Sequence, residues 1–410
     1  MKSIRLCLYL LLLFTTWGNV KAQERSLSYP EILDQTDAAF QKAHWKEVVQ
    51  ICEKALAEGN DAFVIRQYLG IAYYRQKQYT QALPHFRKAL AYFGSEPITQ
   101  EYLYFTLLLL DRGLEANAVA REMEPEDQAR LGLKPNRKWM FTYIEPGAKL
   151  STLEGLKPMV LSTLGIGHRL GRTMEAYHAG AYIAQENNGF RYQQYQYYLL
   201  NQGLVVPNQT VETALHVVGM NGKSNTFGME QKGLALYGGW RWAPTRWEIT
   251  PQVTWTRLQT ALQTSAGATV KDSSATTTQV GLSVGYWPRM GKGRIWLGWQ
   301  NEVALHKYDT LLEENSQVFF LMKARIWAQI HPKLNLTTFY YAGRVPLASE
   351  DKGSLFLNSP DLTTKKWGLM AEFPVTPNVS LYGVYQLEAK EKSNTSYQNH
   401  AIITGIKIKP

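Results

Sequence analysis

The chain has 410 residues, which is enough for two domains, and only 19% of them are charged. Its 31 glycines, 24 tyrosines and 12 tryptophans suit turns and aromatic girdles, although a soluble all-β protein could share them. The two cysteines are Cys7 and Cys52. Because Cys7 lies in a removable leader, we expect no intrachain disulfide and no cysteine metal cluster. The formal net charge of +10 points to an anionic partner.

The N-terminus has the three parts of a secretory signal peptide. Lys2 and Arg5 form a basic end, residues 6–14 form an apolar run, and Ala22 is a small residue suited to cleavage. The run is too short for a membrane-anchor helix. We therefore expect residues 1–22 to be removed. Removal takes Lys2, Arg5 and Lys21 and no acid, which lowers the net charge to +7. An exported chain rarely meets nucleic acid, so we expect the positive charge either to bind an anionic glycolipid or to line a pore.

Residues 23–134 repeat with a period of 34. Trp45 and Tyr79 are related by this offset, and so are Ala55 and Ala89. The second copy resembles the tetratricopeptide signature, in which small residues let two helices approach and aromatic residues fill the space between hairpins. The residues that carry this resemblance are Tyr68, Leu69, Gly70, Tyr73, Ala82, Phe86, Ala89 and Pro97. We expect about three helical hairpins that bind a protein client, with Tyr68, Tyr73, Tyr74 and Arg75 at the partner-binding surface.

Residues 135–410 alternate apolar and polar side chains, which is the pattern of half-buried strands. The clearest pair of strands flanks a glycine-rich turn at 288–293, with aromatic residues near the strand ends as in membrane-spanning hairpins. Short proline-rich connections alternate with longer polar ones, which favours a membrane barrel over a soluble β-sandwich. The long connections are predicted at about 259–275, 306–316, 344–364 and 389–400. Twelve or sixteen strands are alternatives to the fourteen that we predict. The predicted strands are 138–146, 158–169, 173–185, 189–199, 208–219, 232–242, 247–258, 276–287, 293–305, 317–330, 333–343, 365–374, 377–388 and 401–409.

Charged residues on these strands are expected to face a polar lumen. An outward lysine or arginine at the bilayer midplane costs about 2–4 kcal/mol, so these side chains should point inward. The residues concerned are Glu248, Arg294, Glu302, Lys323 and Arg325.

Signatures of catalysis are weak in this chain. Gly281, Ser283 and Gly285 fit a nucleophile pattern, but they lie within a predicted strand and not at a strand-to-helix elbow. No histidine or carboxylate pair has metal spacing, so we expect no enzyme, no cofactor and no metal.

The domain order, with an export signal, periplasmic tetratricopeptide repeats and a C-terminal barrel, resembles the surface lipoprotein assembly modulators. The segment from Thr376 to Leu381, followed by Ser393, Asn394 and Tyr397, is similar to the closing hairpin of that family. The exopolysaccharide export porins are a second resemblance, with more repeats and a larger barrel. The end of the chain departs from both because it lacks a terminal aromatic residue.

The resemblance implies an outer-membrane protein whose periplasmic repeats dock a periplasmic or surface-destined client and assist its translocation or surface assembly, with lipid around the barrel and no nucleic-acid partner. The alternative is a channel or porin for polysaccharide or small solutes, with the repeats recruiting periplasmic partners. A third possibility is an anchor that only tethers periplasmic partners.

Overall fold

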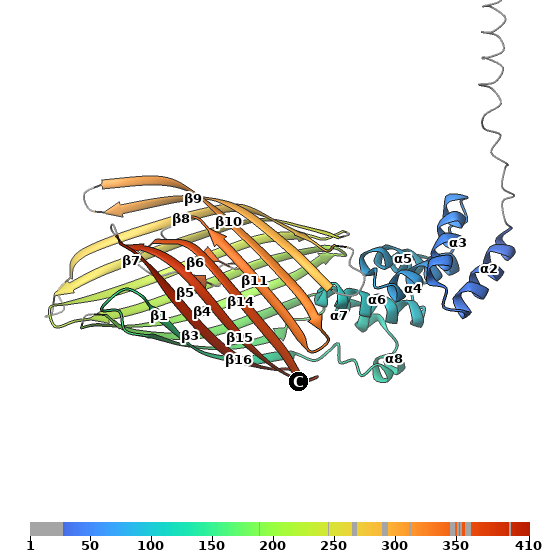
Figure 1. Cartoon of the computed structure of the whole chain (residues 1–410), viewed down its shortest axis with the longest axis horizontal. Coiled ribbons are helices and arrows are strands. Elements are labelled where there is room, and N and C mark those ends of the chain that lie inside the picture. The colour runs from blue at the N-terminus through green and yellow to red at the C-terminus, as the bar shows by residue number, and fades with distance from the viewer. Residues whose placement is uncertain are drawn as a thin grey trace, which may run out of the picture.

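The computed structural model describes residues 28–410 apart from a set of short gaps. The gaps are residues 188, 245, 265–268, 289–293, 311–312, 345–348, 351, 353–354, 357–361 and 393–394. The predicted signal peptide, residues 1–22, lies outside the described residues. The fold is a helical region followed by a closed antiparallel barrel of fourteen strands, which confirms the predicted fold class (Figure 1).

Six helices of the helical region form three antiparallel hairpins that stack side by side. Helix α2 contacts α4 as well as its hairpin partner α3, and α4 contacts α6. A short seventh helix, α8, leads into the linker. The bounds are α2 (Tyr29–Gln41), α3 (Trp45–Ala57), α4 (Phe63–Arg75), α5 (Tyr79–Tyr92), α6 (Pro97–Leu109), α7 (Gly113–Glu122) and α8 (Pro125–Arg130).

The three hairpin turns repeat in geometry as well as in sequence. Each contains one residue in the left-handed region, and these residues are 34 positions apart: Ala43 at φ 56°, Lys77 at φ 61° and Asp111 at φ 56°. In each turn this residue's N–H donates to the carbonyl three positions earlier, and the next N–H donates to the carbonyl five positions earlier. Such bonds satisfy the last carbonyls of a helix. The period read from the sequence is therefore a period of the backbone.

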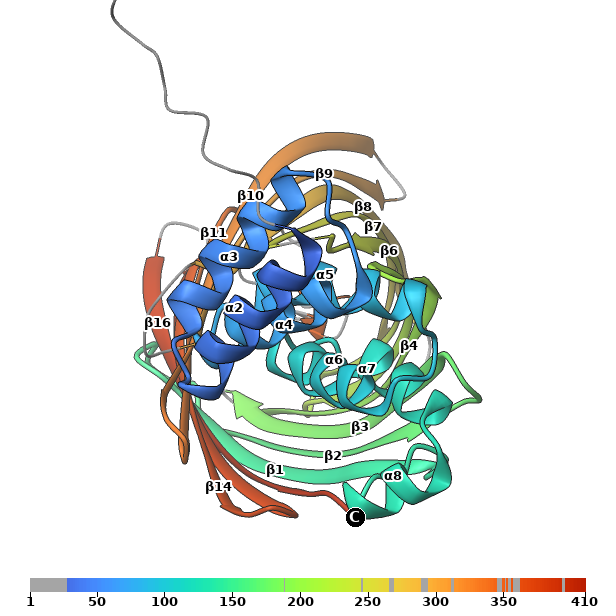
Figure 2. The same ribbon diagram turned by 90° about the vertical axis from the view of Figure 1, so that its right-hand side faces the viewer.

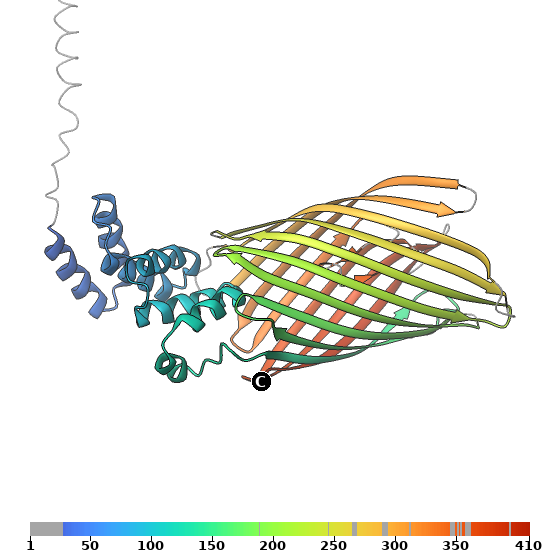
Figure 3. The ribbon, with the colours of Figure 1, turned by 180° about the vertical axis from the view of Figure 1, so that it is seen from behind.

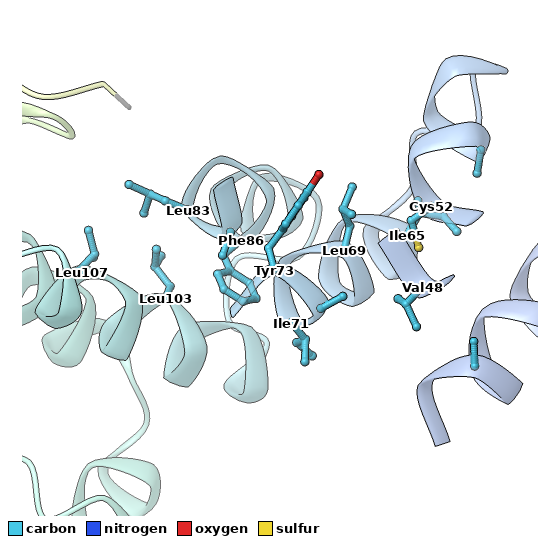
Figure 4. Packing of buried hydrophobic residues seen from close by; sticks show 14 of the residues in the cluster. Val48, Cys52, Ile65, Leu69, Ile71, Tyr73, Leu83, Phe86, Leu103 and Leu107 are labelled. Carbon is cyan, nitrogen blue, oxygen red and sulfur yellow. The ribbon is translucent and has the colours of Figure 1, made fainter. Parts of the chain in front are cut away.

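The core of the helical region lies between the hairpins. Ile65, Leu69 and Phe86 are fully buried there (Figure 4). A Cβ on Gly70 would lie 2.6 Å from Cε1 of Phe86, so only glycine lets α4 approach α5 this closely. Gly70 and Phe86 thus form one complementary contact, which explains why both belong to the repeat signature.

The sheet closes because β1 pairs with β16. Around the barrel each strand pairs with the next one in chain order, and β11 pairs directly with β14. The ordered segments β12 (Ser349–Glu350) and β13 (Leu355–Phe356) pair only with each other. The barrel strands are β1 (Trp139–Ser151), β2 (Met159–Arg169), β3 (Met174–Asn187), β4 (Phe190–Val206), β5 (Gln209–Lys223), β6 (Phe227–Trp242), β7 (Trp247–Thr264), β8 (Thr269–Tyr286), β9 (Arg294–Thr310), β10 (Glu313–His331), β11 (Leu334–Ala342), β14 (Leu362–Thr376), β15 (Val379–Lys392) and β16 (Thr395–Ile408).

We call the barrel opening next to the helices the helical end, and the opposite opening the far end. The C-terminus lies at the helical end, near α8 (Figures 1 and 3). At the far end the prediction of long polar connections at 259–275, 306–316 and 389–400 was wrong. Strands continue through most of these segments, because their threonines and alternating polar residues extend the ladder beyond the apolar part of the wall. The connection at 343–361 stays long.

The two faces of the wall differ in chemistry. Large apolar side chains are exposed on the outer face, including Leu164 at 57%, Val280 at 57% and Phe320 at 75%. On the inner face the buried side chains include Glu212, Gln279 and Lys366. An apolar outside around a polar inside is the arrangement that a bilayer selects, and a soluble sandwich would bury its apolar face instead.

Replacing Phe86 by alanine should destabilise the helical region by about 3–5 kcal/mol, because a fully buried ring would leave a cavity beside Gly70. The measurement is urea unfolding of the full-length protein in detergent, followed by helical circular dichroism. The matched control is Phe93→Ala, since Phe93 is 65% exposed. Equal losses for the two variants would contradict the packing described here.

Candidate functional site

The helical region lies across the barrel opening at the helical end. Viewed along this direction, α4, α5, α6 and α7 lie in front of the opening, with strands around them (Figure 2). The nearest parts of the barrel are the turns that follow β2, β4 and β6. The helices therefore stand at the entrance to the lumen on this side.

A buried cluster of ions attaches the helices to the turn between β4 and β5. The Glu115 carboxylate on α7 accepts from Arg87 of α5 and from Arg112, whose Nε lies 2.6 Å from Oε1. Both arginines also donate to Oδ1 of Asn208, with Arg112 Nη2 at 2.6 Å. Arg112 is 3% exposed and Glu115 is 6% exposed. Burial lowers the pKa of Arg87 to about 10 and lowers that of Arg112 in the same direction.

This geometry depends on the backbone of Asn208. The residue has φ 71°, a conformation that asparagine tolerates in tight turns. Its side-chain oxygen accepts from two guanidinium groups while its N–H lies 3.3 Å from Oε2 of Glu115. Two flanking contacts extend the junction: Arg121 Nη2 donates to the Gly171 carbonyl at 2.9 Å, and Arg246 Nε donates to Oγ1 of Thr80 at 3.1 Å. The helices are thus fixed to three turns of the barrel.

A cavity of about 530 Å³ remains between the helices and the inner wall. The helices and linker contribute apolar side chains such as Tyr104, Leu108 and Leu133, whereas the barrel contributes Glu175, Arg241 and Gln202. Lys352, from the connection between β11 and β14, also lines the cavity. The cavity is therefore bounded by the helices on one side and by a segment inside the barrel on the other.

Lys352 is held on the inner wall close to the helical end. Its Nζ lies 2.6 Å from Oε1 of Glu212, which is 1% exposed, and its carbonyl accepts from the Tyr198 hydroxyl at 3.1 Å. Gln202 supplies a further donor to Glu212 at 2.7 Å. Since β11 ends and β14 begins at the far end, Lys352 lies at the opposite end of the barrel from the two strand ends that flank it.

A second carboxylate organises the inner wall four strands away, and Tyr237 and Gln252 link it to Glu212. Glu302 of β9 accepts from the amides of Gln252, Gln279 and Gln300, and its Oε2 lies 3.1 Å from Nζ of Lys323. Glu302 and Lys323 are 4% and 5% exposed. Four donors around one carboxylate compensate its removal from water.

The other predicted lumen residues occupy different places. Arg325 donates to the Tyr341 hydroxyl at 3.2 Å, on the inner wall next to Lys323. Glu248 accepts from Nε1 of Trp287 at 2.8 Å, near the turn at the helical end. The side chain of Arg294 lies outside the described residues, so its expected inward direction stays a prediction.

A third cluster, which the sequence analysis missed, is rich in lysine. Glu388 of β15 lies 2.9 Å from Nζ of Lys149 and 3.8 Å from that of Lys366. Lys390, two positions farther along the same face of β15, is 3% exposed. The inner wall at β1, β14 and β15 thus brings three ammonium groups around one carboxylate.

An aromatic surface on the helical hairpins contains part of the predicted partner-binding set. We define it as Trp45, Tyr74, Arg75, Tyr79 and Tyr102. Arg75 is exposed, lies 5.9 Å above the Trp45 ring and 5.7 Å above the Tyr102 ring, and donates to the Tyr102 hydroxyl at 2.8 Å. Tyr74 makes edge contacts with Tyr79 and Tyr102 at 5.3 and 5.0 Å. Two of the predicted residues, Tyr74 and Arg75, therefore belong to one surface.

The other two predicted partner residues serve the packing of the helices. Tyr73 is 6% exposed, its hydroxyl donates to Glu53, and its ring stacks on His85. Such burial leaves it no face for a partner, and Figure 4 shows it among the core side chains. Tyr68 is partly buried, packs on Phe40 at 4.8 Å and donates to Asp37.

Within the part of the chain that the structure describes, no group of three or more histidine, cysteine or acidic side chains is placed to hold a metal ion. Among those same residues, no helix combines the length and apolar character needed to cross a membrane. Ser283 lies within β8, three residues before its end, and is paired with Thr250 and Gln300 across the sheet. A strand interior lacks the sharp turn that exposes a nucleophile.

Comparison with solved structures matches the barrel to outer-membrane proteins of low identity. The CymD monoaromatic hydrocarbon channel is 6% identical, with 67% of this chain and 89% of that chain covered and a TM-score of 0.45. The P. putida toluene transporter TodX is 6% identical, with 70% and 92% covered and a TM-score of 0.43. The translocator domain of autotransporter NalP from Neisseria meningitidis is 12% identical, with 67% and 88% covered and a TM-score of 0.35. No family model and no curated protein matches the chain.

The closed sheet, the apolar outer face and the polar inner wall define an outer-membrane β-barrel preceded by a helical region. Its particular features are helices attached by buried ions across one opening and an internal segment bound to the wall through Lys352.

Replacing Glu115 by glutamine should loosen the junction by about 3–5 kcal/mol, because Arg112 would remain buried, and Arg87 partly buried, without a counter-charge. The measurement is the rate of trypsin cleavage in the linker, which contains Lys134, Arg137 and Lys138. Faster cleavage is expected for this variant and wild-type cleavage for Glu122→Gln, an exposed change on the same helix. Equal rates would show that the cluster does not hold the helices in place.

The helical region should lose stability on acidification because of His85. Burial and the neighbouring Arg66 guanidinium lower the pKa of His85 from 6.5 to about 4. The unfolded chain therefore binds a proton that the folded chain rejects, and stability should fall by about 3 kcal/mol as the pH drops from about 6.5 to about 4. Urea unfolding at several pH values measures this loss.

The pKa of Asp61 is lowered to about 2, so protonation of Asp61 reduces stability only at still lower pH. The loss of stability between pH 6.5 and pH 4 is therefore assigned to His85. The variant His85→Gln should flatten the pH dependence, whereas His44→Gln, which alters an exposed histidine, should not. An unchanged slope in His85→Gln would refute the assignment.

Proposed function

We propose that this protein is an outer-membrane translocation or assembly factor whose helical hairpins dock a protein client at the periplasmic opening of the barrel. One observation carries the proposal: the helices that carry exposed Arg75 and its half-buried aromatic neighbours are fixed across the barrel opening by the cluster of Arg87, Arg112 and Glu115. A docking surface that only tethered partners would not need a rigid position over the lumen.

The chemistry of the aromatic surface suits an extended peptide. Aromatic rings in edge contact offer contact area at low entropic cost, and an arginine in front of them can pair with a client carboxylate or carbonyl. Stacked hairpins of this kind create extended binding surfaces along the solenoid. Residues 23–134 would therefore act in the periplasm as a docking module of tetratricopeptide type, as in the surface lipoprotein assembly modulators.

The lumen favours a gated role over a permanently open pore. Lys352 binds Glu212 on the inner wall at the helical end, and the helices cover the same opening from outside. A client delivered by the helices would reach the cavity that both parts line. The barrel would then guide or receive the client after these contacts rearrange. No reaction is required, so we propose a function that is not enzymatic.

The lysine cluster on the inner wall supports a second candidate, a channel for anionic polysaccharide or small solutes. Lys149 and Lys366 surround Glu388, and an excess of positive charge on a pore wall favours anions. This candidate predicts conductance in planar bilayers and reduced anion selectivity in Lys149→Gln/Lys366→Gln. The matched control is Lys307→Gln on the outer face. Absence of conductance would exclude the channel and leave the assembly factor.

Photo-crosslinking in living cells tests client docking directly. A photoreactive residue at Tyr74 should capture a discrete exported protein, whereas the same residue at Glu126 on α8 should not. The double variant Tyr74→Ala/Arg75→Ala should reduce surface display of that protein several-fold while the barrel inserts normally. Unchanged display and identical crosslinks at both positions would contradict the proposal.

A further inference from the structure

One sector of the barrel rim at the helical end is strongly basic. It comprises the linker after α8, the turn between β2 and β3, the end of β16 and Arg121 of α7. Its seven cations are Arg121, Lys134, Arg137, Lys138, Arg169, Arg172 and Lys409, of which Lys134 and Arg169 line the cavity between the helices and the inner wall. Residues 131–140 contain no acid, and Glu175 near the β2–β3 turn lies 3.6 Å from Arg169. The other acids close in sequence lie on α7 and α8, where Asp127 pairs with Arg130.

Backbone contacts bring these cations together. The N–H of Arg169 donates to the Lys138 carbonyl at 2.7 Å, and its guanidinium reaches the Arg137 carbonyl at 3.3 Å. Arg121 donates to the carbonyl of Gly171, next to Arg172. Lys138, Arg172 and Lys409 are exposed. Like charges held this close repel one another, and the pKa of Arg121 is lowered first by burial and then by the positive charges of Arg169 and Arg172. Such a cluster is stabilised by a bound anion.

The sector lies where the apolar outer face begins. Trp139, Leu170 and Met174 are exposed there at 40%, 45% and 44%, each within two residues of a cation of the sector. Around the rim, Trp240, Trp242 and Trp247 are exposed at the same end of their strands. Exposed aromatic residues mark the level of lipid headgroups in membrane barrels. The cations therefore lie at headgroup depth.

Polar rings interrupt the apolar outer face directly beside these cations. His168 and His178 stack with ring centroids 4.8 Å apart, and Nδ1 of His178 lies 2.5 Å from the Tyr197 hydroxyl. Their neighbours on the same face, Leu164 and Ile166, are exposed apolar side chains. Polar groups facing hydrocarbon are costly unless a hydrogen-bonding partner reaches them. Ester and phosphate oxygens of a lipid are such partners.

We propose that this sector, over β1–β3 and the end of β16, is a binding site for the phosphate headgroup of an anionic glycerophospholipid in the leaflet at the helical end. The phosphates pair with Lys138, Arg172 and Lys409. The glycerol region meets His178 and Tyr197, and the acyl chains lie along the apolar wall. The inference rests on insertion of the barrel in a membrane and adds a lipid partner to the proposed function.

The far end also carries exposed cations. Arg191 of β4 lies opposite Lys223 in the ladder and 2.9 Å from Glu186, whereas the three cations Lys223, Arg257 and Lys307 stand on the separate strands β5, β7 and β9. These three residues supply a control that removes the same charge from the same protein at the opposite end.

The test uses the full-length protein, delipidated in detergent and titrated with cardiolipin or with zwitterionic phosphatidylethanolamine under native mass spectrometry. The rim variant is Lys138→Gln/Arg172→Gln/Lys409→Gln, and the control is Lys223→Gln/Arg257→Gln/Lys307→Gln. Loss of three cations should weaken cardiolipin binding about tenfold or more in the rim variant. The control should bind as the wild type does, and phosphatidylethanolamine should bind weakly to all three proteins.

Heat-modifiable migration on gels confirms that each variant is a folded barrel. A second variant, His178→Leu/Tyr197→Phe, keeps every cation and should lower cardiolipin binding by a few-fold. If the rim and control variants lost cardiolipin binding equally, the binding would reflect general charge attraction, and the proposed site would be refuted. Tighter binding of lipid A than of cardiolipin would contradict the assignment of the site to the leaflet at the helical end. No client is present in this assay, so failure of client docking would leave its result unchanged.

Discussion

Closure of the hydrogen-bonded sheet is the constraint on which the rest of this structure depends. A backbone N–H or carbonyl in hydrocarbon has no water to bind, so a sheet in a membrane must have no free edge. Pairing of β1 with β16 meets this requirement. Once the sheet is closed, side chains divide between two faces, and charged ones such as Glu302 and Lys323 can only be accommodated inside. The hydrogen-bond networks in the lumen therefore follow from closure of the sheet, and no catalytic role is needed to explain them.

The helical region is built on a different principle. Its hairpins bury small and aromatic residues locally, as Gly70 and Phe86 do, and its period survives in the backbone of three turns. The two parts meet through ions and not through an apolar interface. A buried Arg–Glu–Arg cluster is sensitive to geometry, and this fixes the angle at which the helices cross the opening.

The sequence predicted the elements better than their contacts. The alternation of apolar and polar residues predicted all fourteen strands because each strand has one face in lipid. The 34-residue period predicted the helical hairpins. The connections predicted at the far end were too long, because a polar strand and a polar loop have similar sequences beyond the apolar part of the wall. Arg87 and Asn208 are 121 positions apart, and Lys352 and Glu212 are 140 apart, so spacing offers no signal for either contact. The lysines around Glu388 are hidden for the same reason, whereas Tyr74 and Arg75 were accessible because they lie within one repeat.

The pairing of β1 with β16 also sets an order of events during biogenesis. The helices use contacts between neighbours in the chain and can form as soon as residues up to about 130 are available, because local contacts form quickly. The cylinder instead needs its two most distant strands, so until Thr395–Ile408 arrives both β1 and β15 expose unpaired edges. A folded docking module would therefore precede the completed pore and would stand beside open edges that a chaperone must protect.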